Sequence, residues 1–487
     1  MRLRILYYNW VDYLDDEGRG GGVSVYQRNL MRAWAGERMT EVTFLSAGLS
    51  HDLRGGAPRW EQIRHGPDEN RARRYEIVNS AVLAPAHHAF GQHAQITDPA
   101  TEIAVEEFIH ETGPYDVIHF NNLEGLPAGV LRLRGAFPQT KFILSLHNYY
   151  PICPQVNLWQ REARSCVDFD GGRACVNCLP RRHDTRHLRL ANGLAYRLKR
   201  RGIRPGTHSF NLLFGNAMRV GGRLARLVSG MRRRRAPVGL AADEAAHFAA
   251  RRPAMIDAIN ETCDAVLCVS DRVRAIAAQY GINPDILHTS YIGTAHAAHF
   301  KSTRPAESLL ASDGTLHAAY LGYMRSDKGF PFLLGALEAL PDADAKRLHL
   351  TVAAMNGAPE MLARMQALTP RLASLTHVNG YSPDGLDDLL RDVNLGLIPV
   401  MWEDNLPQVA IEMHARHIPL LTSDMGGASE LGGTDALTHR AGDAADFGAK
   451  IADVLNGHVD MDAYWKGALA PVSMDAHLAD LRAHYSG

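Results

Sequence analysis

Short apolar runs alternate with longer amphipathic stretches along most of the chain. Each short run is apolar at consecutive positions, as expected for strands buried on both faces of a parallel sheet. In the first 300 residues the predicted strands are 5–9, 117–120, 142–146 and 265–269. Repeated strand-helix units predict an α/β fold built on parallel sheets.

The strand-helix pattern restarts after a Pro- and Ser-containing stretch at 301–313, and we place a domain boundary there. Strands are predicted at 316–321, 348–352, 395–400 and 419–422. The two domains are therefore expected at 1–300 and 314–470. The remaining segment, 471–487, carries Leu478, Leu481 and Tyr485 at helical spacing, so we expect a helix that crosses back onto the first domain.

A long insertion, 151–260, separates the third and fourth predicted strands of the first domain. It is too long for a simple loop and carries four of the six cysteines. Its stretches 197–201 and 219–235 mix Leu, Val and Met with Arg at spacings that permit one apolar face. We expect part of the insertion to be helical.

Length and composition restrict the class of protein. A chain of 487 residues is expected to hold two or three domains, and 46% hydrophobic with 22% charged residues is typical of a soluble enzyme. The apolar stretches fall short of the roughly 20 residues that span a bilayer. The first strand is followed by Asn9 and Asp12, which breaks any apolar run of signal-peptide length. We expect a cytoplasmic protein.

The net charge of −1 hides a strong asymmetry. Between Arg181 and Arg235 there are sixteen Lys and Arg residues and one acidic residue, Asp184, so this segment carries +15. Such a segment favours either an anionic partner or a solvated helical insertion. Its Arg residues flank apolar positions that include Leu212, Leu213, Phe214, Leu224 and Leu227. This arrangement predicts peripheral docking on an anionic membrane surface or a lipid-linked acceptor.

Three segments carry candidate chemistry at the junctions between strands and helices. A glycine loop with Gly21 and Gly22 enters a helix after the first strand, where bare backbone can approach a phosphate or pack closely. Lys328 and His147 each follow a predicted strand, and open α/β sheets bind ligands at this edge. The lysine could neutralise a diphosphate.

The segment 402–412 is the strongest local signal, because acidic residues flank a helix that Pro407 can begin. Asp404 precedes the helix, where its carboxylate can accept hydrogen bonds from sugar hydroxyls. Glu412 lies within the helix, where it faces either ribose hydroxyls or solvent.

Taken in order, these motifs resemble the retaining nucleotide-sugar glycosyltransferases of family four. Their GT-B fold has two Rossmann-like domains whose parallel sheets face each other across a cleft. The resemblance covers nearly the whole chain and rests on the following pieces: the glycine loop to Leu30, Asp-Val-Ile-His at 116–119, Leu-His-Asn at 146–148, Val-Ser at 269–270, Lys-Gly at 328–329, the acidic-x7-Glu pattern from Asp404 to Glu412, and the segment 424–430.

The resemblance implies a role for each residue around a nucleotide-diphosphate sugar. Gly21 and Gly22 would approach the donor diphosphate, and Lys328 would stabilise its charge as it leaves. Glu412 would hold the ribose, and His147 would lie near the reacting centre. The donor sugar and phosphates would be held by Asp404 and by the backbone of Asn405, Leu406 and Pro407. Such enzymes usually need no catalytic divalent metal.

The chain departs from the family pattern at three positions. Tyr323 stands where an Arg is common, with Arg325 two residues later as a substitute for diphosphate binding. Asn148 and Asp404 replace the usual Asp and Glu. No carboxylate is placed as an enzymic nucleophile, so we expect a same-face displacement in which the departing phosphate helps to deprotonate the acceptor.

Two other functions fit parts of the sequence. A nucleotide-sugar 2-epimerase shares the fold but would need further acid and base groups near the sugar. A non-catalytic scaffold could bind an anionic polymer through the basic segment. That segment has few interleaved aromatic residues, among them Phe210 and Phe214, so we do not expect nucleic acid as its partner.

Four cysteines, Cys153, Cys166, Cys175 and Cys178, form a C-x12-C-x8-C-x2-C pattern. Four thiolates would complete the tetrahedral shell of one structural Zn²⁺. Reduced thiols and disulfides are the alternatives, and cytosolic redox conditions disfavour the disulfides. Cys263 and Cys268 flank a predicted strand and are expected in the core.

Overall fold

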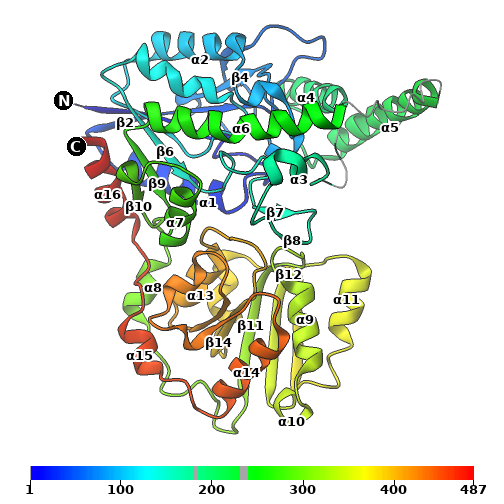
Figure 1. Ribbon diagram of the computed structural model, residues 1–487, viewed down its shortest axis with the longest axis vertical. Coiled ribbons are helices and arrows are strands. Elements are labelled where there is room, and N and C mark those ends of the chain that lie inside the picture. Colours follow the sequence, from blue (N-terminus) through cyan, green and yellow to red (C-terminus); the bar gives the residue numbers. More distant parts are fainter. Residues whose placement is uncertain (1, 180–181, 183, 231–239, 487) are drawn as a thin grey trace.

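The computed structural model has two α/β domains, one above the other in Figure 1. It describes residues 2–179, 182, 184–230 and 240–486, without the side chains of 220–242. Each domain is built on its own, mainly parallel, sheet. The α/β class and the parallel sheets expected from the sequence are confirmed.

The amino-terminal domain is built on an eight-stranded sheet of order β10-β9-β6-β5-β1-β2-β4-β3. Its pairings are parallel except for the antiparallel β3–β4 pair. The strands are β1 Leu3–Tyr8, β2 Thr40–Ala47, β3 Arg59–Gln62, β4 Arg74–Val78, β5 Val117–Phe120, β6 Lys141–Leu146, β9 Ala265–Cys268 and β10 Leu287–Thr289. Its longer helices are α1 Gly21–Ala35, α2 Pro99–Thr112, α6 Leu240–Thr262 and α7 Asp271–Gln279.

The segment between β6 and β9 contains a small hairpin and several helices. The hairpin consists of β7 Trp159–Gln160 and β8 Arg164–Ser165 and lies at the boundary between the domains (Figure 1). The helices that follow are α3 Arg173–Val176, α4 Thr185–Arg200 and α5 His208–Gly230. Asp184 caps α4 by accepting a hydrogen bond from the N–H of Arg186. The predicted helical stretches at 197–201 and in the first part of 219–235 lie at the end of α4 and within α5, and residues 231–235 lie outside the described part.

The carboxyl-terminal domain is built on a parallel sheet of order β13-β12-β11-β14-β15-β16. Its strands are β11 Leu316–Tyr323, β12 Leu348–Met355, β13 Ser374–Val378, β14 Leu395–Ile398, β15 Leu420–Ser423 and β16 Thr438–His439. The helices around it are α9 Phe330–Ala339, α10 Asp342–Ala345, α11 Pro359–Gln366, α12 Leu386–Leu389, α13 Gln408–His414 and α14 Ala444–Leu455. The helix α8 Ala297–Ser302 lies in the connection between the domains (Figure 1).

The chain returns to the amino-terminal domain at its end. After α15 Met461–Lys466 it runs to α16 Met474–Ser486, which packs against α1 (Figure 1). Leu478, Leu481 and Tyr485 are buried there. The Tyr485 hydroxyl lies 2.7 Å from the Tyr7 hydroxyl of the central strand β1. The two ends of the chain are therefore joined by a buried contact.

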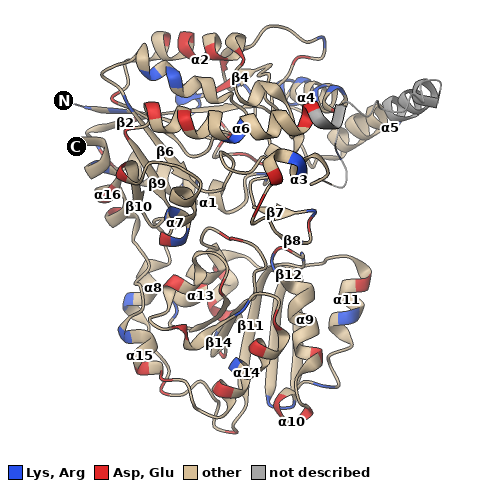
Figure 2. Ribbon diagram, viewed as in Figure 1, with Lys and Arg blue, Asp and Glu red and all other residues tan. Residues whose placement is uncertain are grey.

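The apolar core of the amino-terminal domain continues into the carboxyl-terminal domain. One cluster of buried side chains includes Ile5, Leu144 and Val266 as well as Ile398 and Leu406, whereas a second cluster fills the rest of the carboxyl-terminal domain. Figure 2 shows acidic residues along α2 and around α10, and charges of both signs at the end of α7 that faces the carboxyl-terminal domain. The interface therefore combines apolar packing with charged contacts.

Every strand predicted from an apolar run overlaps a strand in the structure, but six strands of the two main sheets and both strands of the small hairpin were missed. They are β2, β3, β4, β10, β13 and β16 in the sheets and β7 and β8 in the hairpin. In β4 the charged residues Arg74 and Glu76 are buried because each has a polar partner, so the strand carries no apolar run. The insertion predicted at 151–260 lies between the strands predicted at 142–146 and 265–269, which are β6 and β9, and these two strands are neighbours in the sheet.

Candidate active site

A cleft of about 3510 Å³, open to solvent, separates the two domains. It is lined by the carboxyl ends of strands from both sheets and by the amino-terminal turns of α1 and α13. Among the residues predicted for donor binding and catalysis, all except Arg325 line this cleft: Gly21, Gly22, His147, Lys328, Asp404, Asn405, Leu406, Pro407 and Glu412. Residues from positions 21 to 412 are thus brought together in one place.

The glycine loop forms one wall of the cleft at the start of α1. A Cβ atom on Gly22 would lie 3.2 Å from the side chain of Gln408 at the start of α13 in the other domain. The first N–H groups of α1 have no intrahelical acceptor, and helix amino termini favour anions. This wall can therefore receive a phosphate group close to the backbone.

His147 follows β6 at the floor of the cleft. Burial, together with the nearby His477, lowers its pKa to about 3, so the imidazole is neutral at physiological pH. Its Nε2 atom is buried and has no hydrogen-bond partner among the described residues. The imidazole packs against the ring of Tyr26, with 4.9 Å between centroids. A neutral imidazole with a free nitrogen can donate or accept a hydrogen bond near a substrate.

Lys328 and Asp404 both line the cleft and form an ion pair with each other. Its Nζ atom donates to Oδ2 of Asp404 at 2.5 Å and lies 5.2 Å from the centroid of the Trp402 ring. The turn before α9 positions this lysine, because Gly329 has φ +74° and a Cβ there would lie 1.6 Å from the carbonyl oxygen of Pro399. Only glycine fits this approach. The ammonium group is therefore held at the carboxyl end of β11.

Contacts with both domains hold the loop from Asp404 to Pro407. The carbonyl of Asn405 accepts a hydrogen bond of 2.8 Å from Ser270 Oγ, which belongs to the amino-terminal domain. Gly426 packs against Asp404 so closely that a Cβ would lie 2.1 Å from the Asp404 carbonyl oxygen. Pro407 is the residue before α13 rather than its first residue. The loop is thus fixed between the two domains.

Glu412 projects from α13 into a partly buried environment. Tyr381 donates a hydrogen bond of 2.7 Å to its Oε2 atom, and His296 Nε2 lies 3.8 Å from Oε1. Burial raises the pKa of Glu412, and the contact with Tyr381 and the charge of Arg416 moderate the rise. Tyr381 and His296 also line the cleft. Neither residue belongs to a motif that would have identified it from the sequence.

Arg325 does not lie with the other predicted residues. Its guanidinium group forms two hydrogen bonds with Asp327, at 2.9 and 2.7 Å, and its side chain is 62% exposed. Asp327 holds this group, and Arg325 is not among the residues that line the cleft, so its role as a substitute for the usual diphosphate-binding arginine stays a prediction. Tyr323, which stands where the family commonly has an Arg, does line the cleft.

The predicted metal ligands lie beside the cleft, around α3 and the small hairpin. All six cysteines of the chain are free thiols, so disulfides are absent, and Cys263 and Cys268 are buried in the core as predicted. Burial, together with the neighbouring thiols, raises the pKa of Cys166 to about 11 and that of Cys175 to about 12. Among the described residues, no three of the four predicted sulfur ligands lie within 4.8 Å of one another.

One acidic cluster has carboxylate oxygen atoms within 4.8 Å of one another. It consists of Asp15, Asp16 and Glu17 in the loop before α1. Cationic side chains already occupy it in part, because Arg19 pairs with Asp15 and Glu17, and Lys199 Nζ lies 3.2 Å from Glu17. The cluster therefore reads as an ion-pair network rather than a metal centre.

Residues 316–457 match the family described as "Glycosyl transferases group 1". This range covers nearly all of the carboxyl-terminal sheet, including Lys328, Asp404 and Glu412. A comparison with curated protein sequences gave no match. The family match identifies a glycosyltransferase, and it rests on the domain that carries most of the predicted donor-site residues.

Solved structures with the same fold align over the whole chain. HepE from Anabaena in complex with UDP has a TM-score of 0.54 at 11% identity and covers 100% of both chains. A UDP-forming α,α-trehalose-phosphate synthase from Burkholderia vietnamiensis gives 0.54 at 12%, again with full coverage of both. Sucrose-phosphate synthase from Thermosynechococcus elongatus gives 0.51 at 15%, covering 99% of this chain and 96% of the other. The fold is GT-B.

Proposed function

We propose that the protein transfers a sugar from a nucleotide-diphosphate sugar to an acceptor hydroxyl, with retention of anomeric configuration. The observation that carries this proposal is the convergence of the predicted donor residues on the interdomain cleft. Lys328, Asp404 and Glu412 come from one domain, and Gly22 and His147 come from the other. A donor held between them would have its leaving group beside a lysine and a helix amino terminus.

Each group on this cleft has a part in the reaction. Lys328 neutralises the departing diphosphate, and the backbone of Gly21 and Gly22 approaches its oxygen atoms. The carboxylate of Asp404 accepts hydrogen bonds from the donor sugar once Lys328 turns to the phosphate. Glu412 accepts from the ribose hydroxyls. The backbone of Asn405, Leu406 and Pro407 completes the donor site.

Retention follows a same-face displacement in this proposal. The bond between the anomeric carbon and the diphosphate oxygen breaks, and the acceptor oxygen forms a new bond on the same face. The acceptor proton passes to the departing phosphate oxygen. His147 is neutral because its pKa is low, so it contributes a hydrogen bond near the reacting centre rather than a positive charge. No residue acts as a covalent nucleophile, and the reaction needs no divalent metal.

Uridine nucleotides are the first donors to test. The HepE structures are described as complexes with UDP and with UDP-glucose, and the trehalose-phosphate synthase is described as UDP-forming. The acceptor is a carbohydrate or a lipid-linked sugar, as in polysaccharide or glycolipid synthesis.

A panel of radiolabelled nucleotide sugars, starting with UDP-glucose, tests the proposal. The purified protein should bind one donor and release its sugar, and NMR of the transferred sugar should show the anomeric configuration of the donor. An inverted product would exclude retention. Inversion of the configuration at C2 of the donor sugar without any acceptor would instead identify an epimerase. A protein that binds no nucleotide sugar would overturn the proposal.

We also propose one structural Zn²⁺ on Cys153, Cys166, Cys175 and Cys178. The free thiols lie close enough to raise one another's pKa. The four sulfur atoms must move closer together for each of them to lie 2.3 Å from one zinc ion. Three guanidinium groups, those of Arg182, Arg251 and Arg252, lie near the thiols and would balance the charge of four thiolates. The metal would fix one wall of the cleft without entering the reaction.

Elemental analysis of protein purified without added metal decides this second proposal. About one zinc per chain is expected, and a Cys175→Ser, Cys178→Ser double variant should lose it. Cys263→Ala removes a buried thiol far from the cluster in sequence and should keep the metal. Wild-type protein free of zinc would reject the site.

The basic segment supports a third proposal, peripheral docking at the cytoplasmic face of an anionic membrane. No helix within the described residues is long and apolar enough to cross a bilayer. On α5, Leu212, Leu213 and Met218 are 51%, 47% and 41% exposed, and Arg219 follows them. The rest of the predicted docking surface, Leu224, Leu227 and the Arg residues at 232–235, lies outside the described side chains. Each basic residue near an anionic surface contributes about 1 kcal/mol.

Sedimentation with phospholipid vesicles tests the docking. The protein should pellet with vesicles that contain phosphatidylglycerol and stay in solution with phosphatidylcholine alone. A Leu212→Ser, Leu213→Ser variant should bind the anionic vesicles several-fold more weakly. Equal absence of binding to both kinds of vesicle would reject the proposal.

A further inference from the structure

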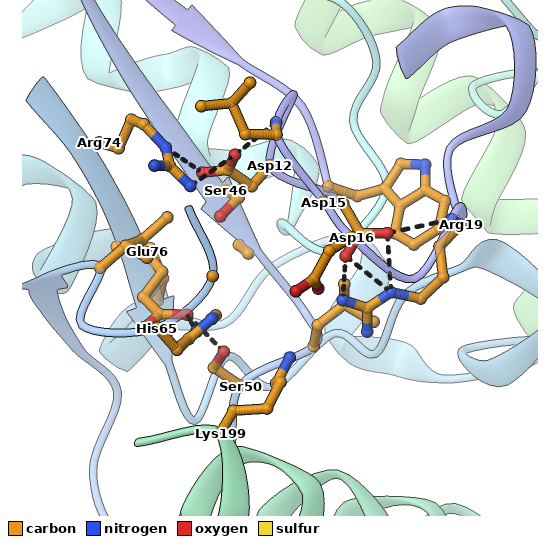
Figure 3. Close-up of a pocket in the computed structure, with 17 residues that line it drawn as sticks. Asp12, Asp15, Asp16, Arg19, Ser46, Ser50, His65, Arg74, Glu76 and Lys199 are labelled. Carbon is orange, nitrogen blue, oxygen red and sulfur yellow. Dashed lines mark hydrogen bonds and ion pairs between the residues drawn. The ribbon is translucent and has the colours of Figure 1, made fainter. Parts of the chain in front are cut away.

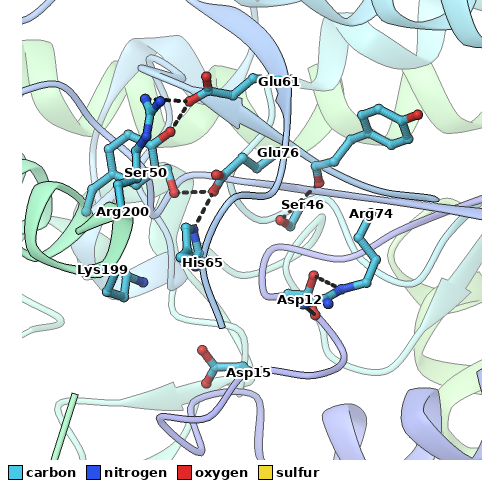
Figure 4. A network of polar contacts seen from close by, with 12 residues as sticks. Asp12, Asp15, Ser46, Ser50, Glu61, His65, Arg74, Glu76, Lys199 and Arg200 are labelled. Atoms are coloured by element: carbon cyan, nitrogen blue, oxygen red, sulfur yellow. Dashed lines mark hydrogen bonds and ion pairs between the residues drawn. The ribbon is translucent and has the colours of Figure 1, made fainter. Parts of the chain in front are cut away.

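Four acidic side chains are buried within the described part of the chain, and one of them has no basic partner. They are Glu76, Glu124, Asp327 and Asp404. Asp327 and Asp404 pair with Arg325 and Lys328, at 2.7 and 2.5 Å. Oε2 of Glu76 lies 3.2 Å from Nε2 of His65 (Figure 4). Glu124 forms no ion pair with a described residue, so its carboxylate is the exception.

Two partly buried acidic residues of the same domain are balanced by arginine. At the small pocket shown in Figure 3, Asp12 accepts two hydrogen bonds from Arg74, at 3.0 and 3.1 Å, and Asp15 pairs with Arg19. A buried carboxylate without a cation loses its hydration and is tolerated where hydrogen bonds replace the lost water. The hydrogen bonds of Glu124 must therefore supply this replacement.

Glu124 accepts hydrogen bonds from uncharged donors at both carboxylate oxygens. The N–H of Ala86 donates to Oε2 at 2.6 Å, and the side-chain amide of Asn148 donates to Oε1 at 2.7 Å. Burial raises the pKa of Glu124 to about 7, and these two contacts act against the rise because they favour the ionised form. Above this pH the carboxylate is an acceptor for Asn148.

The backbone at Glu124 is fixed by neighbouring elements. Tyr8 of β1 donates through its hydroxyl to the Glu124 carbonyl, and Ser80 Oγ donates to the next carbonyl, that of Gly125, at 2.6 Å. Gly125 has φ +84°, and a Cβ there would lie 2.3 Å from the carbonyl oxygen of Ala47 at the end of β2. Only glycine fits this approach. The carboxylate therefore projects from a backbone that cannot easily move.

Asn148 uses both ends of its side-chain amide. Its Oδ1 atom accepts from the N–H of Tyr150 at 3.0 Å, while its Nδ2 atom donates to Glu124. Reversing the amide would lose both contacts. An aspartate, which the family pattern leads us to expect at this position, would place a second carboxylate against Oε1 of Glu124. Asn148 and Glu124 are therefore matched to each other.

His147 lies immediately before Asn148, in the turn that follows β6. Its imidazole lines the interdomain cleft and forms no hydrogen bond with the described residues. The ring packs against that of Tyr26, with 4.9 Å between centroids. Because no hydrogen bond holds the ring, its orientation depends on this packing and on the conformation of the turn, which Asn148 and Glu124 fix.

We propose that Glu124 is a positioning residue of the candidate active site, because its hydrogen bond to Asn148 fixes the turn that presents His147 to the cleft. The proposal rests on the glycosyltransferase function proposed above and goes beyond its donor contacts, since neither Glu124 nor Asn148 is among the residues that line the cleft. Losing the pair should change the orientation of His147, whereas the donor contacts of Lys328 and Glu412 remain. We therefore expect an effect on kcat rather than on KM.

Exchanging the two side chains tests the pairing. Glu124→Gln leaves one N–H donor facing another, and Asn148→Asp sets two carboxylates against each other. The double variant restores one amide and one carboxylate with their places exchanged, and the introduced amide can still accept from the N–H of Ala86. At pH 8, kcat for sugar transfer should fall about ten-fold in each single variant and return to within about three-fold of wild type in the double variant. The KM for the nucleotide sugar should change by less than about two-fold in all three.

The donor for these assays is the nucleotide sugar with the highest turnover in the panel that starts with UDP-glucose. Glu107→Gln, at an exposed position of α2, is the matched control and should keep the wild-type kcat. Asn148→Ala removes the donor to Glu124 without adding a charge, so it should also lose about ten-fold in kcat and replaces Asn148→Asp if that variant does not fold. Wild-type kcat in the folded single variants would overturn the proposal. A double variant whose loss equals the product of the two single losses would do the same.

The orientation of the imidazole can also be followed without any substrate. The Cε1–Hε1 NMR signal of His147, identified by its absence in His147→Phe, should shift in both single variants and return toward the wild-type position in the double variant. Unchanged signals in the single variants would overturn the positioning role. If the signal shifts and recovers as expected but no nucleotide sugar is bound or cleaved, the proposed function fails and the positioning of His147 by Glu124 stands.

Discussion

The hydroxyl of Tyr26 lies 2.8 Å from Nε2 of His477, so the first helix of the chain and the last are joined beside the cleft. Burial raises the pKa of Tyr26 and lowers that of His477 to about 4, so both groups are neutral at physiological pH. His147 also contacts Tyr26, because its imidazole packs on the Tyr26 ring. The carboxyl-terminal helix thereby fixes a residue of the candidate active site through one tyrosine.

Tyr26→Phe should keep the ring but break the link to His477. We expect kcat for donor turnover to fall by about ten-fold with a smaller change in KM, because His147 loses its fixed orientation while the donor contacts remain. The buried Nε2 of His477 would be left unpaired, at a cost of about 1–3 kcal/mol in the free energy of unfolding. Steady-state kinetics and urea unfolding measure the two effects. A variant that loses stability but keeps kcat would show that the contact is structural alone.

Lys328→Ala should reduce kcat for donor turnover by about 10²–10³, because the departing diphosphate loses its positive partner. Asp404 would lose its ion-pair partner as well, so a Lys328→Ala, Asp404→Ala double variant is measured alongside. Lys346→Ala is the control, since within the described part of the chain that ammonium group bonds only the Pro370 carbonyl on the surface. Wild-type turnover in folded Lys328→Ala would exclude the assigned donor site.

Glu412→Gln should act mainly on donor binding. The amide keeps the size of the side chain but weakens the hydrogen bonds that a carboxylate offers to ribose hydroxyls. We expect the KM for the nucleotide sugar to rise by about ten-fold, while that for the acceptor stays near its wild-type value. Isothermal calorimetry with the free nucleoside diphosphate provides an independent measurement. Unchanged nucleotide affinity would show that Glu412 does not contact the ribose.

Stability should fall as the pH is lowered from 7.5 to 5. Burial lowers the pKa of His51, His414 and His477 to about 4 and that of His147 to about 3. Their contribution is complete above the unfolded value of about 6.5 and is lost as the pH falls toward the folded value. A single such histidine loses about 2 kcal/mol over this window.

Glu124 opposes this trend. Burial raises its pKa to about 7, so its contribution is complete below about 4.5 and is lost as the pH rises through 7. Glu124→Gln should therefore steepen the dependence of Tm on pH, which differential scanning fluorimetry can follow. A Tm that stays constant between pH 7.5 and 5 in the wild type would contradict the assignment of these histidines as buried and neutral.

The sequence predicted the fold from the strands that are buried on both faces. Strands such as Val117–Phe120 have apolar side chains at every buried position but one, and they appear as short apolar runs. Strand β4 was missed because buried Arg74 and Glu76 are stabilised by partners far away in sequence, such as Asp12. A one-dimensional pattern does not show such pairing.

The same limit applies to the candidate site. Lys328 and Glu412 were predicted because Lys328 follows a strand and Glu412 lies in the helix after one, and both line the cleft. Arg325 does not line the cleft, because its neighbour Asp327 binds the guanidinium group, and this contact depends on the conformation of one turn. Tyr381 and His296 were missed because they reach Glu412 from separate loops. Local sequence carries no sign of either contact.

Glu430 of the carboxyl-terminal domain caps helix α7 of the amino-terminal domain. Its carboxylate accepts hydrogen bonds from the N–H groups of Asp271 and Arg272, at 2.9 and 2.6 Å, and from the Tyr291 hydroxyl at 2.7 Å. Beside it, Arg272 pairs with Glu403, next to Asp404 in the donor loop. A carboxylate at a helix amino terminus is stabilising, so these contacts favour closed domains.

Glu430→Ala should shift the domains toward a more open arrangement and raise the KM for the nucleotide sugar by about three- to ten-fold. The reason is that part of the donor's binding energy must then close the cleft, which reduces apparent affinity in proportion to the closed fraction. Small-angle X-ray scattering should show a larger radius of gyration for the variant alone, and saturating nucleoside diphosphate should reduce it. Glu360→Ala, on the short helix α11, is the control for a lost acidic residue. If Glu430→Ala has the radius of gyration and the donor KM of the wild type, the contacts of Glu430 stabilise helix α7 alone and do not affect closure of the domains.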